Sequence, residues 1–199
     1  MRDGTKTRER IEAAALRLFV EKGVAETSVR DIAQSAGVAE GALYRHHAGK
    51  DDLVWSLFHT HYTEFAATLD ALQRPEAGLE RKIAAMVGGF CRLFDADRTL
   101  FSFLLLAQHG QLAKLAPETA TPITVVGDVI ARALKAGEIA PGDPDLLTAM
   151  VVGIVLQTAT FRIYGRITPP LSALVPDLSA ACWSVLDRPR TILTRQRLA

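Results

Sequence analysis

Residues 27–50 read TSVRDIAQSAGVAEGALYRHHAGK, and the fold expected for the whole chain follows from this stretch. Ser28 gives a helix start signal because its hydroxyl can accept from a free backbone N–H, and the carboxylate of Asp31 falls in the first turn. Gly37 ends the helix where a left-handed residue is usually needed. The apolar residues between them recur three and four positions apart and predict one buried face: Val29, Ile32, Ala33 and Ala36.

A second short helix fits residues 39–46, and Leu43 is its only large apolar residue. A helix that buries one leucine is not stable alone, so its exposed face is expected to meet a partner. Small residues at Gly41 and Ala42 permit a close backbone approach. Tyr44 can donate to a phosphate, and Arg45 can bond the major-groove edge of guanine. The two helices together predict a helix-turn-helix that lies in a groove of DNA.

Several charged residues in or before this stretch each allow two interpretations. Glu40 can accept from a cytosine amino group or can only complement the helix dipole. Lys50 opens the next helix, where a cation is disfavoured unless a phosphate is bound or Asp51 and Asp52 neutralise it. Basic residues at the start of the first helix either touch phosphates or belong to a solvated, frayed terminus: Lys6, Arg8 and Arg10.

The stretch resembles the TetR family of bacterial transcriptional regulators. The segments that carry the resemblance are VRDIA at 29–33, AGVAEGALYRHH at 36–47 and KDDL at 50–53, in register without a gap. They cover the first quarter of the chain, and the remainder is similar in length and helical character. In two places the sequence departs from the family pattern: Ala39 replaces the usual Ser or Thr that caps the recognition helix, and His47 replaces the usual Phe.

The resemblance implies an all-α protein with a helix-turn-helix DNA-binding domain at 1–49 and a helical effector-binding and dimerisation domain at 50–199. It implies that the partners are double-stranded operator DNA, a small-molecule effector and a second copy of the chain. The residues predicted to contact or frame DNA are Thr27, Ser28, Arg30, Ala39, Glu40, Gly41, Ala42, Tyr44, Arg45, His46 and Lys50.

Hydrophobic periodicity predicts helices through the rest of the chain, and no alternating apolar run is long enough to predict a strand. The all-α fold therefore follows from the residues as well as from the resemblance. The expected helices are 5–22, 50–73, 76–95, 98–110, 122–136, 145–166 and 172–187.

The segment 145–166 is apolar nearly all round, so it needs partners on two sides. The simplest arrangement places it with 172–187 in a symmetric homodimer, where two helices from each subunit form the interface. Ala149 and Gly153 either allow close approach of these helices or only relieve crowding. A dimer predicts a palindromic operator.

Polar residues among the apolar core helices suggest a pocket for a small, mostly apolar organic effector. The predicted lining is Tyr62, Phe90, Phe94, Phe101, Leu105, Gln108, His109, Gln157 and Phe161. The main hypothesis is a dimeric repressor that the effector releases from its operator. A DNA-binding protein whose second domain only dimerises is the alternative.

Composition and motifs argue against other classes of function. The net charge is only +1, from 23 Lys and Arg against 22 Asp and Glu, so any basic surface is local. No zinc-protease, nucleophile-elbow or phosphate-cradling motif occurs, which predicts no enzyme, no catalytic residue, no metal and no cofactor. Cys91 and Cys182 are expected to be buried free thiols rather than a disulfide. A polar N-terminus and short apolar runs predict a cytoplasmic protein with no membrane span.

Overall fold

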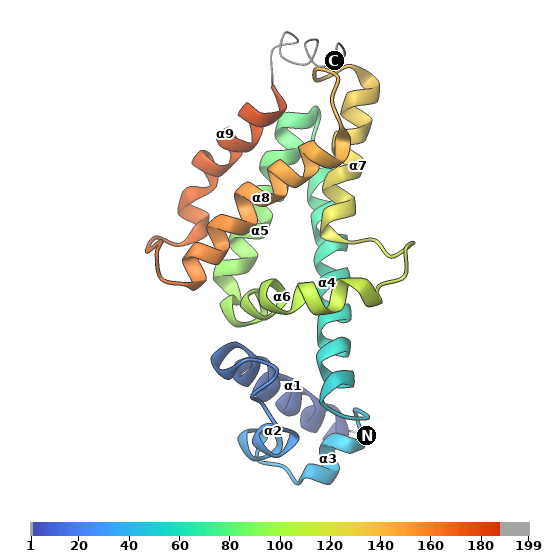
Figure 1. Ribbon diagram of the computed structural model, residues 1–199, viewed down its shortest axis with the longest axis vertical. Helices are drawn as coiled ribbons and strands as arrows, with labels where there is room; N and C mark the ends of the chain where they lie inside the picture. The colour runs from blue at the N-terminus through green and yellow to red at the C-terminus, as the bar shows by residue number, and fades with distance from the viewer. Residues whose placement is uncertain (1, 188–199) are drawn as a thin grey trace, which may run out of the picture. The chain divides into compact units, whose positions relative to one another are not determined.

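The computed structural model describes residues 2–187, and this part of the chain is all-helical, as predicted. Two short helices, α2 and α3, follow a long first helix, and longer helices make up the rest (Figure 1). The elements are α1 (Arg2–Lys22), α2 (Val29–Ala36), α3 (Glu40–Tyr44), α4 (Lys50–Gln73), α5 (Leu79–Ala96), α6 (Arg98–Gln111), η1 (Leu112–Lys114), α7 (Pro122–Ala136), α8 (Pro144–Ile163), η2 (Leu171–Leu174) and α9 (Val175–Leu186).

The described residues form two compact units. The first unit contains residues 2–62 and 97–118, and the second contains 63–96 and 119–187. This division differs from the one expected at residues 49 and 50 because α4 contributes to both units and α6 belongs to the first. The assignment of functional domains to 1–49 and 50–199 stays a prediction.

The core of the first unit is built from α1, α2, α3, the first half of α4, and α6. Phe19 of α1 and Phe103 of α6 are both buried, and their ring centroids are 5.8 Å apart. Sequence periodicity predicted both helices but not this pairing. The largest fully buried side chains in this core are Phe58, Phe103, Ile11, Ile32, Leu43, Leu53 and Val54.

Helix α2 has the ends that its sequence predicts. The Ser28 hydroxyl accepts from the Asp31 amide at 3.1 Å, and the Asp31 carboxylate accepts from the Ser28 amide at 3.0 Å, which completes a capping box. Gly37 has φ +64°, in the left-handed region, and ends the helix. Helix α3 has five residues, shorter than the segment 39–46 expected, and Ala39 gives it no side-chain cap.

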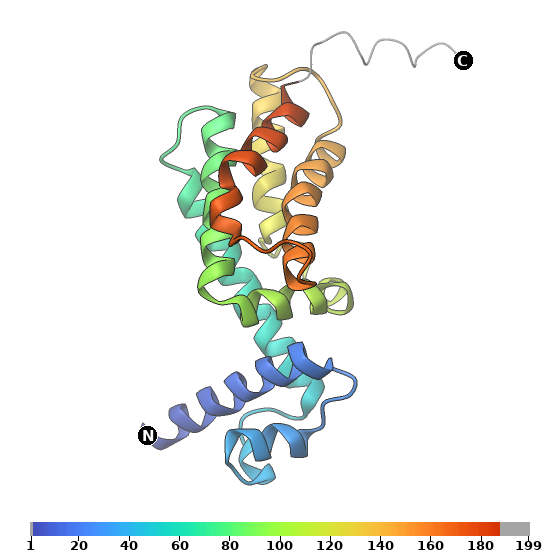
Figure 2. The same cartoon turned by 90° about the vertical axis from the view of Figure 1, so that its left-hand side faces the viewer.

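In the second unit α5 packs on α9, and α8 packs on both α7 and α9 (Figure 2). Thr121 and Thr124 form a capping box at the start of α7, which ends at Gly137 with φ +72°. Asp95 accepts from the amides of Leu171 and Ser172 at 3.0 and 2.8 Å and so holds η2 against α5. Residues 172–174, expected within the last helix, belong instead to this separate 3₁₀ turn.

Helix α8 corrects the expectation that no segment is long enough to cross a membrane. The helix has 20 residues, and an 18-residue window within it has a mean hydropathy of 1.7, so α8 passes that test by length and composition, alone among the helices of residues 2–187. The expectation counted uninterrupted apolar runs, the longest here being 149–156, and missed the continuity of the helix across Thr148 and Gln157. Only 28% of its apolar window is buried inside the protein. Helix α8 therefore leaves apolar surface uncovered.

Candidate nucleic-acid interface

The outer face of α3 is exposed in the way expected of a recognition helix. Glu40, Gly41 and Arg45 are exposed, and Tyr44 keeps 56% of its surface accessible. A Cβ atom added at Gly41 would meet nothing within 4 Å, so another surface can approach the backbone closely there. A large exposed aromatic beside an arginine and an open glycine is suited to contact with a polyanion.

Two residues predicted on this DNA-facing surface lie elsewhere. Ala42 is buried, with only 5% of its surface exposed, because the single turn of α3 directs Ala42 and Leu43 together into the core. Thr27 is 1% exposed, and its hydroxyl donates to the carbonyl oxygen of Gly23 at 2.8 Å. The placement of Ala42 on the outer face was therefore wrong. Thr27 ties the end of α1 to the start of α2, and its predicted contact with DNA stays a prediction.

The remaining predicted contacts frame α3. Ser28 is exposed, and its hydroxyl donates to the Asp31 carboxylate at 2.8 Å. These hydrogen bonds, first of all that from the Ser28 backbone, lower the pKa of Asp31. Arg30 and Ala39 are exposed, and His46 is half-buried. DNA contact by these side chains stays a prediction.

Lys50 is committed to a contact within the protein. Its ammonium group donates to the carbonyl oxygens of Val24 and Ala25 at 2.8 and 3.2 Å. Those carbonyls follow the end of α1, where partial negative charge accumulates, so the cation is stabilised without a phosphate. Neither reading made from the sequence included this contact, because its partners lie 25 and 26 residues away.

Replacing Lys50 with methionine is expected to lower the free energy of unfolding by about 1 kcal/mol. Hydrogen bonds to charged groups contribute roughly 1.5–3 kcal/mol, and partial exposure of Lys50 reduces that value. Urea denaturation measures the loss, and Lys22→Met, at an exposed lysine in the last turn of α1, is the matched control. Unchanged stability together with a smaller salt dependence of DNA binding would instead identify Lys50 as a phosphate contact.

His47 lies buried directly after α3, between α1 and α4. Its Nδ1 is 3.5 Å from the Asp52 carboxylate and its Nε2 is 3.8 Å from that of Glu12, and Nε2 has no hydrogen-bond partner. Desolvation lowers the pKa of His47 from its ordinary 6.5, against the opposing effect of Glu12 and Asp52 and with a small contribution from Arg8. A neutral imidazole therefore fills this site at neutral pH.

The lowered pKa makes stability depend on pH. Below pH 6.5 the unfolded chain takes up a proton at His47 before the folded chain does, so stability falls as the pH drops. His47→Phe is expected to reduce this fall between pH 6.5 and 5, measured as the change in urea midpoint. His109→Phe, at an exposed histidine, is the control. An equal fall in the wild type and His47→Phe would contradict the assignment.

The residues predicted to line an effector pocket are divided between the units. In the first unit Tyr62 and Phe101 are buried, Leu105 and Gln108 are half-buried, and His109 is exposed. Burial raises the pKa of Tyr62 to about 12. In the second unit Phe90 and Phe94 are buried with ring centroids 6.1 Å apart, whereas Gln157 and Phe161 are exposed on α8. Their common role in a pocket stays a prediction.

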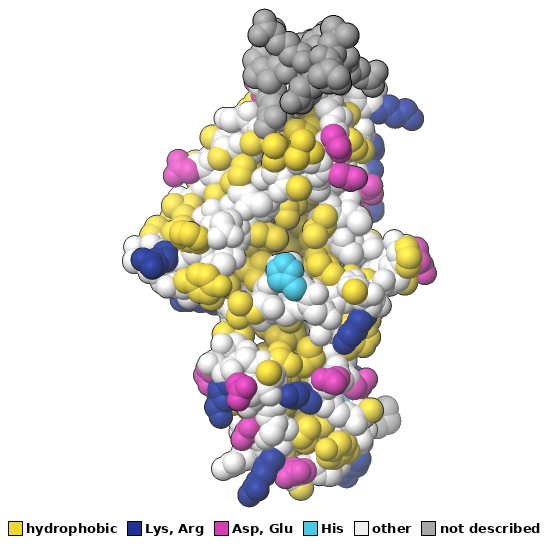
Figure 3. Space-filling view, in the orientation of Figure 1, with side chains coloured by type: hydrophobic (Ala, Val, Ile, Leu, Met, Phe, Trp, Pro, Cys, Tyr) yellow, Lys and Arg dark blue, Asp and Glu magenta, His cyan; other side chains and the backbone are white. Residues whose placement is uncertain are grey.

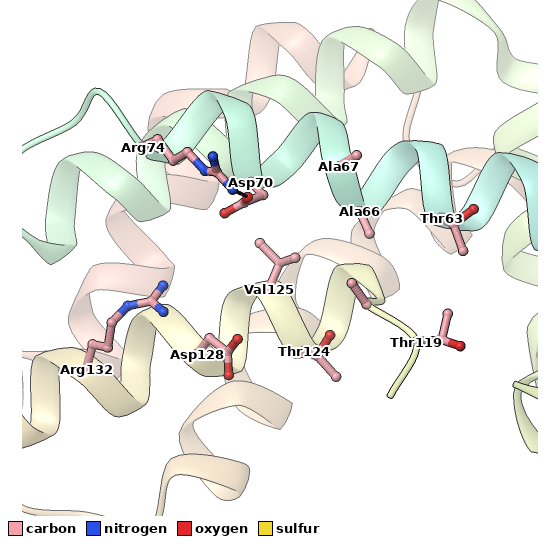
Figure 4. Close-up of a pocket in the computed structure, with 11 residues that line it drawn as sticks. Thr63, Ala66, Ala67, Asp70, Arg74, Thr119, Thr124, Val125, Asp128 and Arg132 are labelled. Atoms are coloured by element: carbon pink, nitrogen blue, oxygen red, sulfur yellow. Dashed lines mark hydrogen bonds and ion pairs between the residues drawn. The ribbon is translucent and has the colours of Figure 1, made fainter. Parts of the chain in front are cut away.

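A groove that the sequence did not indicate lies in the second unit, between the second half of α4 and α7 (Figure 4). Its volume is about 510 Å³, within the range typical of ligand pockets. Ala66 and Val125 form a buried apolar floor, and an acidic and a basic residue lie one turn apart on each wall. The lining residues are Thr63, Ala66, Ala67, Asp70, Arg74, Thr119, Ala120, Thr124, Val125, Asp128 and Arg132.

The charges of this groove are partly paired. Arg74 is ion-paired with Asp70, and the Gln73 amide donates to the same carboxylate at 2.8 Å. These contacts lower the pKa of Asp70, with a smaller contribution from Arg132 across the groove. None of the groove residues was on the predicted lining, because a polar groove has no periodicity that distinguishes it from a solvated helix face.

Other titratable groups do not form a second chemical site. Cys91 and Cys182 are buried free thiols, and burial raises the pKa of each to about 11, which makes both poor nucleophiles. Within residues 2–187 no group of three His, Cys, Asp or Glu side chains is arranged to hold a metal ion.

The capped α2, the glycine turn and the exposed α3 define a helix-turn-helix DNA-binding protein. Residues 11–57 match the family model described as bacterial regulatory proteins, tetR family. The N-terminal segment is therefore a TetR-type DNA-binding domain, and the relatives that the chain resembles are transcriptional regulators. The match includes the two departures at Ala39 and His47.

Relatives and solved structures agree with this assignment. The regulator SrpR of Pseudomonas putida is 26% identical over 96% of this chain and 90% of its own length. The fatty acid metabolism regulator of Bacillus subtilis is 24% identical over 74% of this chain and 78% of its own. The fold resembles that of FadR from Bacillus subtilis in complex with stearoyl-CoA, with a TM-score of 0.73 and 22% identity over 90% of this chain and 99% of that one.

Proposed function

We propose that the protein is a dimeric repressor that binds a palindromic operator and is released by a small, mostly apolar organic effector. The observation that carries the DNA-binding part is the open, exposed backbone at Gly41 on α3, between Glu40 and the side chains of Tyr44 and Arg45. In this account Arg45 reads a base edge and Tyr44 contacts phosphate.

The exposed apolar surface of α8 supports a homodimer. Leu146, Phe161 and Tyr164 keep 52%, 44% and 64% of their surface accessible. Gly153 lies on the same stripe and is open. Beyond its first turn, where Pro176 and Asp177 are exposed, the neighbouring α9 exposes small side chains at Ala180, Ala181 and Ser184, so a second helix pair can approach closely there. Hydrophobic side chains are visible over this part of the second unit in Figure 3.

A two-fold dimer implies the form of the DNA site. Two copies of α3 related by a symmetry axis address half-sites separated by about one helical turn or a multiple of it, so the operator is an inverted repeat. Repression is the simplest outcome of such binding, because a small dimer that occupies a promoter blocks transcription. The bacterial transcriptional regulators among its relatives support a cytoplasmic location.

The groove between α4 and α7 is the place we propose for the effector. Its small apolar floor suits a hydrocarbon portion, and the guanidinium groups of Arg74 and Arg132 suit a polar or anionic end. The Bacillus subtilis FadR complex holds stearoyl-CoA, which combines these two features. An effector that favours one position of α4 changes DNA affinity if its binding differs between two states by about 1–3 kcal/mol.

Selection of bound duplexes from a random pool tests the DNA part. The proposal requires an enriched inverted repeat. Enrichment of a single half-site would contradict the dimeric operator. If the protein enriches no sequence when no ligand is present, release of the operator by an effector is contradicted.

A thermal-shift series with fatty acids of increasing chain length tests the effector part. The wild type is expected to gain stability with chain length and to lose operator affinity at the same concentrations. Arg132→Ala is expected to weaken both effects, and Lys135→Ala, an exposed lysine on α7 outside the groove, is the control. Equal shifts in the two variants would place the ligand elsewhere.

A further inference from the structure

The turn between α2 and α3 is held from outside by Arg10 of α1. One guanidinium nitrogen, Nη2, donates to the carbonyl oxygen of Ala36 at 2.5 Å and to that of Gly37 at 3.1 Å. These oxygens lie at the end of α2, where the helix no longer supplies donors and partial negative charge accumulates. A guanidinium is suited to this position because it remains charged and presents several donors in a fixed plane.

Glycine at position 37 suits both the backbone conformation of the turn and the contact with Arg10. Gly37 has φ +64°. Its amide donates to the carbonyl oxygen of Gln34, and the amide of Val38 donates to the carbonyl oxygen of Ala33. A Cβ atom at residue 37 would lie 2.8 Å from Nη2 of Arg10. Any side chain at this position therefore strains the backbone and displaces the guanidinium.

Helix α3 has little else to fix its orientation. It has five residues, lacks a side-chain cap at Ala39 and buries only Ala42 and Leu43. It begins three residues after Gly37, so a change in the turn moves the whole helix. Arg17 adds a second link from α1, because its guanidinium donates to the Ser35 hydroxyl at 2.5 Å.

We propose that Arg10 is a positioning residue that sets the orientation of the recognition helix by clamping the turn between α2 and α3. It acts through the carbonyls of Ala36 and Gly37 rather than by contacting phosphate. This inference rests on the proposed role of α3 in reading DNA, but the clamp itself can be observed in the free protein.

Arg10→Met and Gly37→Ala test the clamp in two ways. The first removes the donor and one charge, and the second displaces the donor and changes no charge. Both are expected to weaken binding to the selected operator at least about tenfold while affinity for a scrambled duplex changes less than about twofold, because loss of orientation affects base contacts only. Lys6→Met removes a charge from the same exposed part of α1 and is expected to leave the affinity ratio unchanged. Arg10→Lys keeps the charge on a compact ammonium group. Its ratio of operator affinity to scrambled-duplex affinity is expected to lie between those of Arg10→Met and the wild type.

Amide hydrogen exchange on the full-length free protein provides the second readout. Amides of residues 38–44 are expected to exchange faster in Arg10→Met, with those of α5 and α7 unchanged. Thermal unfolding confirms that each variant is folded. Unchanged exchange in the turn would overturn the clamp. Equal weakening for both duplexes, with the salt slope reduced by about 0.9 per phosphate, would make Arg10 a DNA-backbone ligand instead. If the wild type selects no sequence, the proposed function fails, and hydrogen exchange still decides the clamp.

Discussion

Gly41→Leu is expected to reduce operator affinity to the level of scrambled DNA, a loss of about a thousandfold or more if the protein has the specificity ratio typical of such regulators. The backbone at Gly41 is exposed, and an added Cβ meets nothing within 4 Å, so the fold has room for the leucine. The same side chain would hold α3 off the base edges when DNA is bound. Fluorescence anisotropy with operator and scrambled duplexes measures the effect.

Gly110→Leu is the matched control for this substitution. Gly110 lies in α6 and also has open space at its Cβ position, but it is not on α3. We expect its operator affinity to equal that of the wild type. Unchanged affinity in Gly41→Leu would show that the backbone of α3 does not approach DNA closely, and loss of thermal stability in Gly41→Leu would show that the residue serves the fold.

Gly153→Arg is expected to convert the dimer to a monomer and to weaken operator binding by at least about a hundredfold, because the second half-site is then no longer bound at high effective concentration. Gly153 is exposed on α8 in the uncovered apolar stripe, and the isolated subunit has room for the arginine. A charge at this position would be buried without a partner if two copies met there. Sedimentation velocity reports the oligomeric state directly.

Gly110→Arg controls for the added charge and size. It is expected to remain dimeric, because α6 is not part of the proposed interface. A dimeric Gly153→Arg variant with normal operator affinity would show that the apolar surface of α8 serves another purpose.

Features governed by neighbouring residues could be predicted from the sequence. The boundaries of α2, α4 and α7 follow from local signals such as the Ser28 capping box and the glycines at 37 and 137, and the structure has those helices as expected. The family assignment followed from the same local stretch. Short-range hydrogen bonds and periodicity are sufficient for this part of the fold.

Features governed by distant contacts could not be predicted. The sequence does not show that Phe103 packs on Phe19, which makes α6 part of the first unit. It does not show that Lys50 and Arg10 bind carbonyl oxygens more than 20 residues away. In both cases a cation near a predicted DNA-binding helix suggests a phosphate contact, although backbone carbonyls at helix ends attract the same charge.

The faces of very short helices were the other source of error. Ala42 was placed outside because a small residue gives little periodic signal, and a helix of five residues has too few positions to define a face. The same limit applies to the groove between α4 and α7, whose lining combines alanines, threonines and paired charges. Only the arrangement of the two helices in space reveals it.

The most direct test of the central claim is the ratio of affinities for the selected operator and a scrambled duplex of equal length, measured with the number of chains bound. The account predicts two chains on each operator and an affinity at least about a thousandfold higher than for the scrambled duplex at the same salt concentration. Equal affinity for the two duplexes, or saturation of the operator by one chain, would contradict a dimeric, sequence-specific regulator.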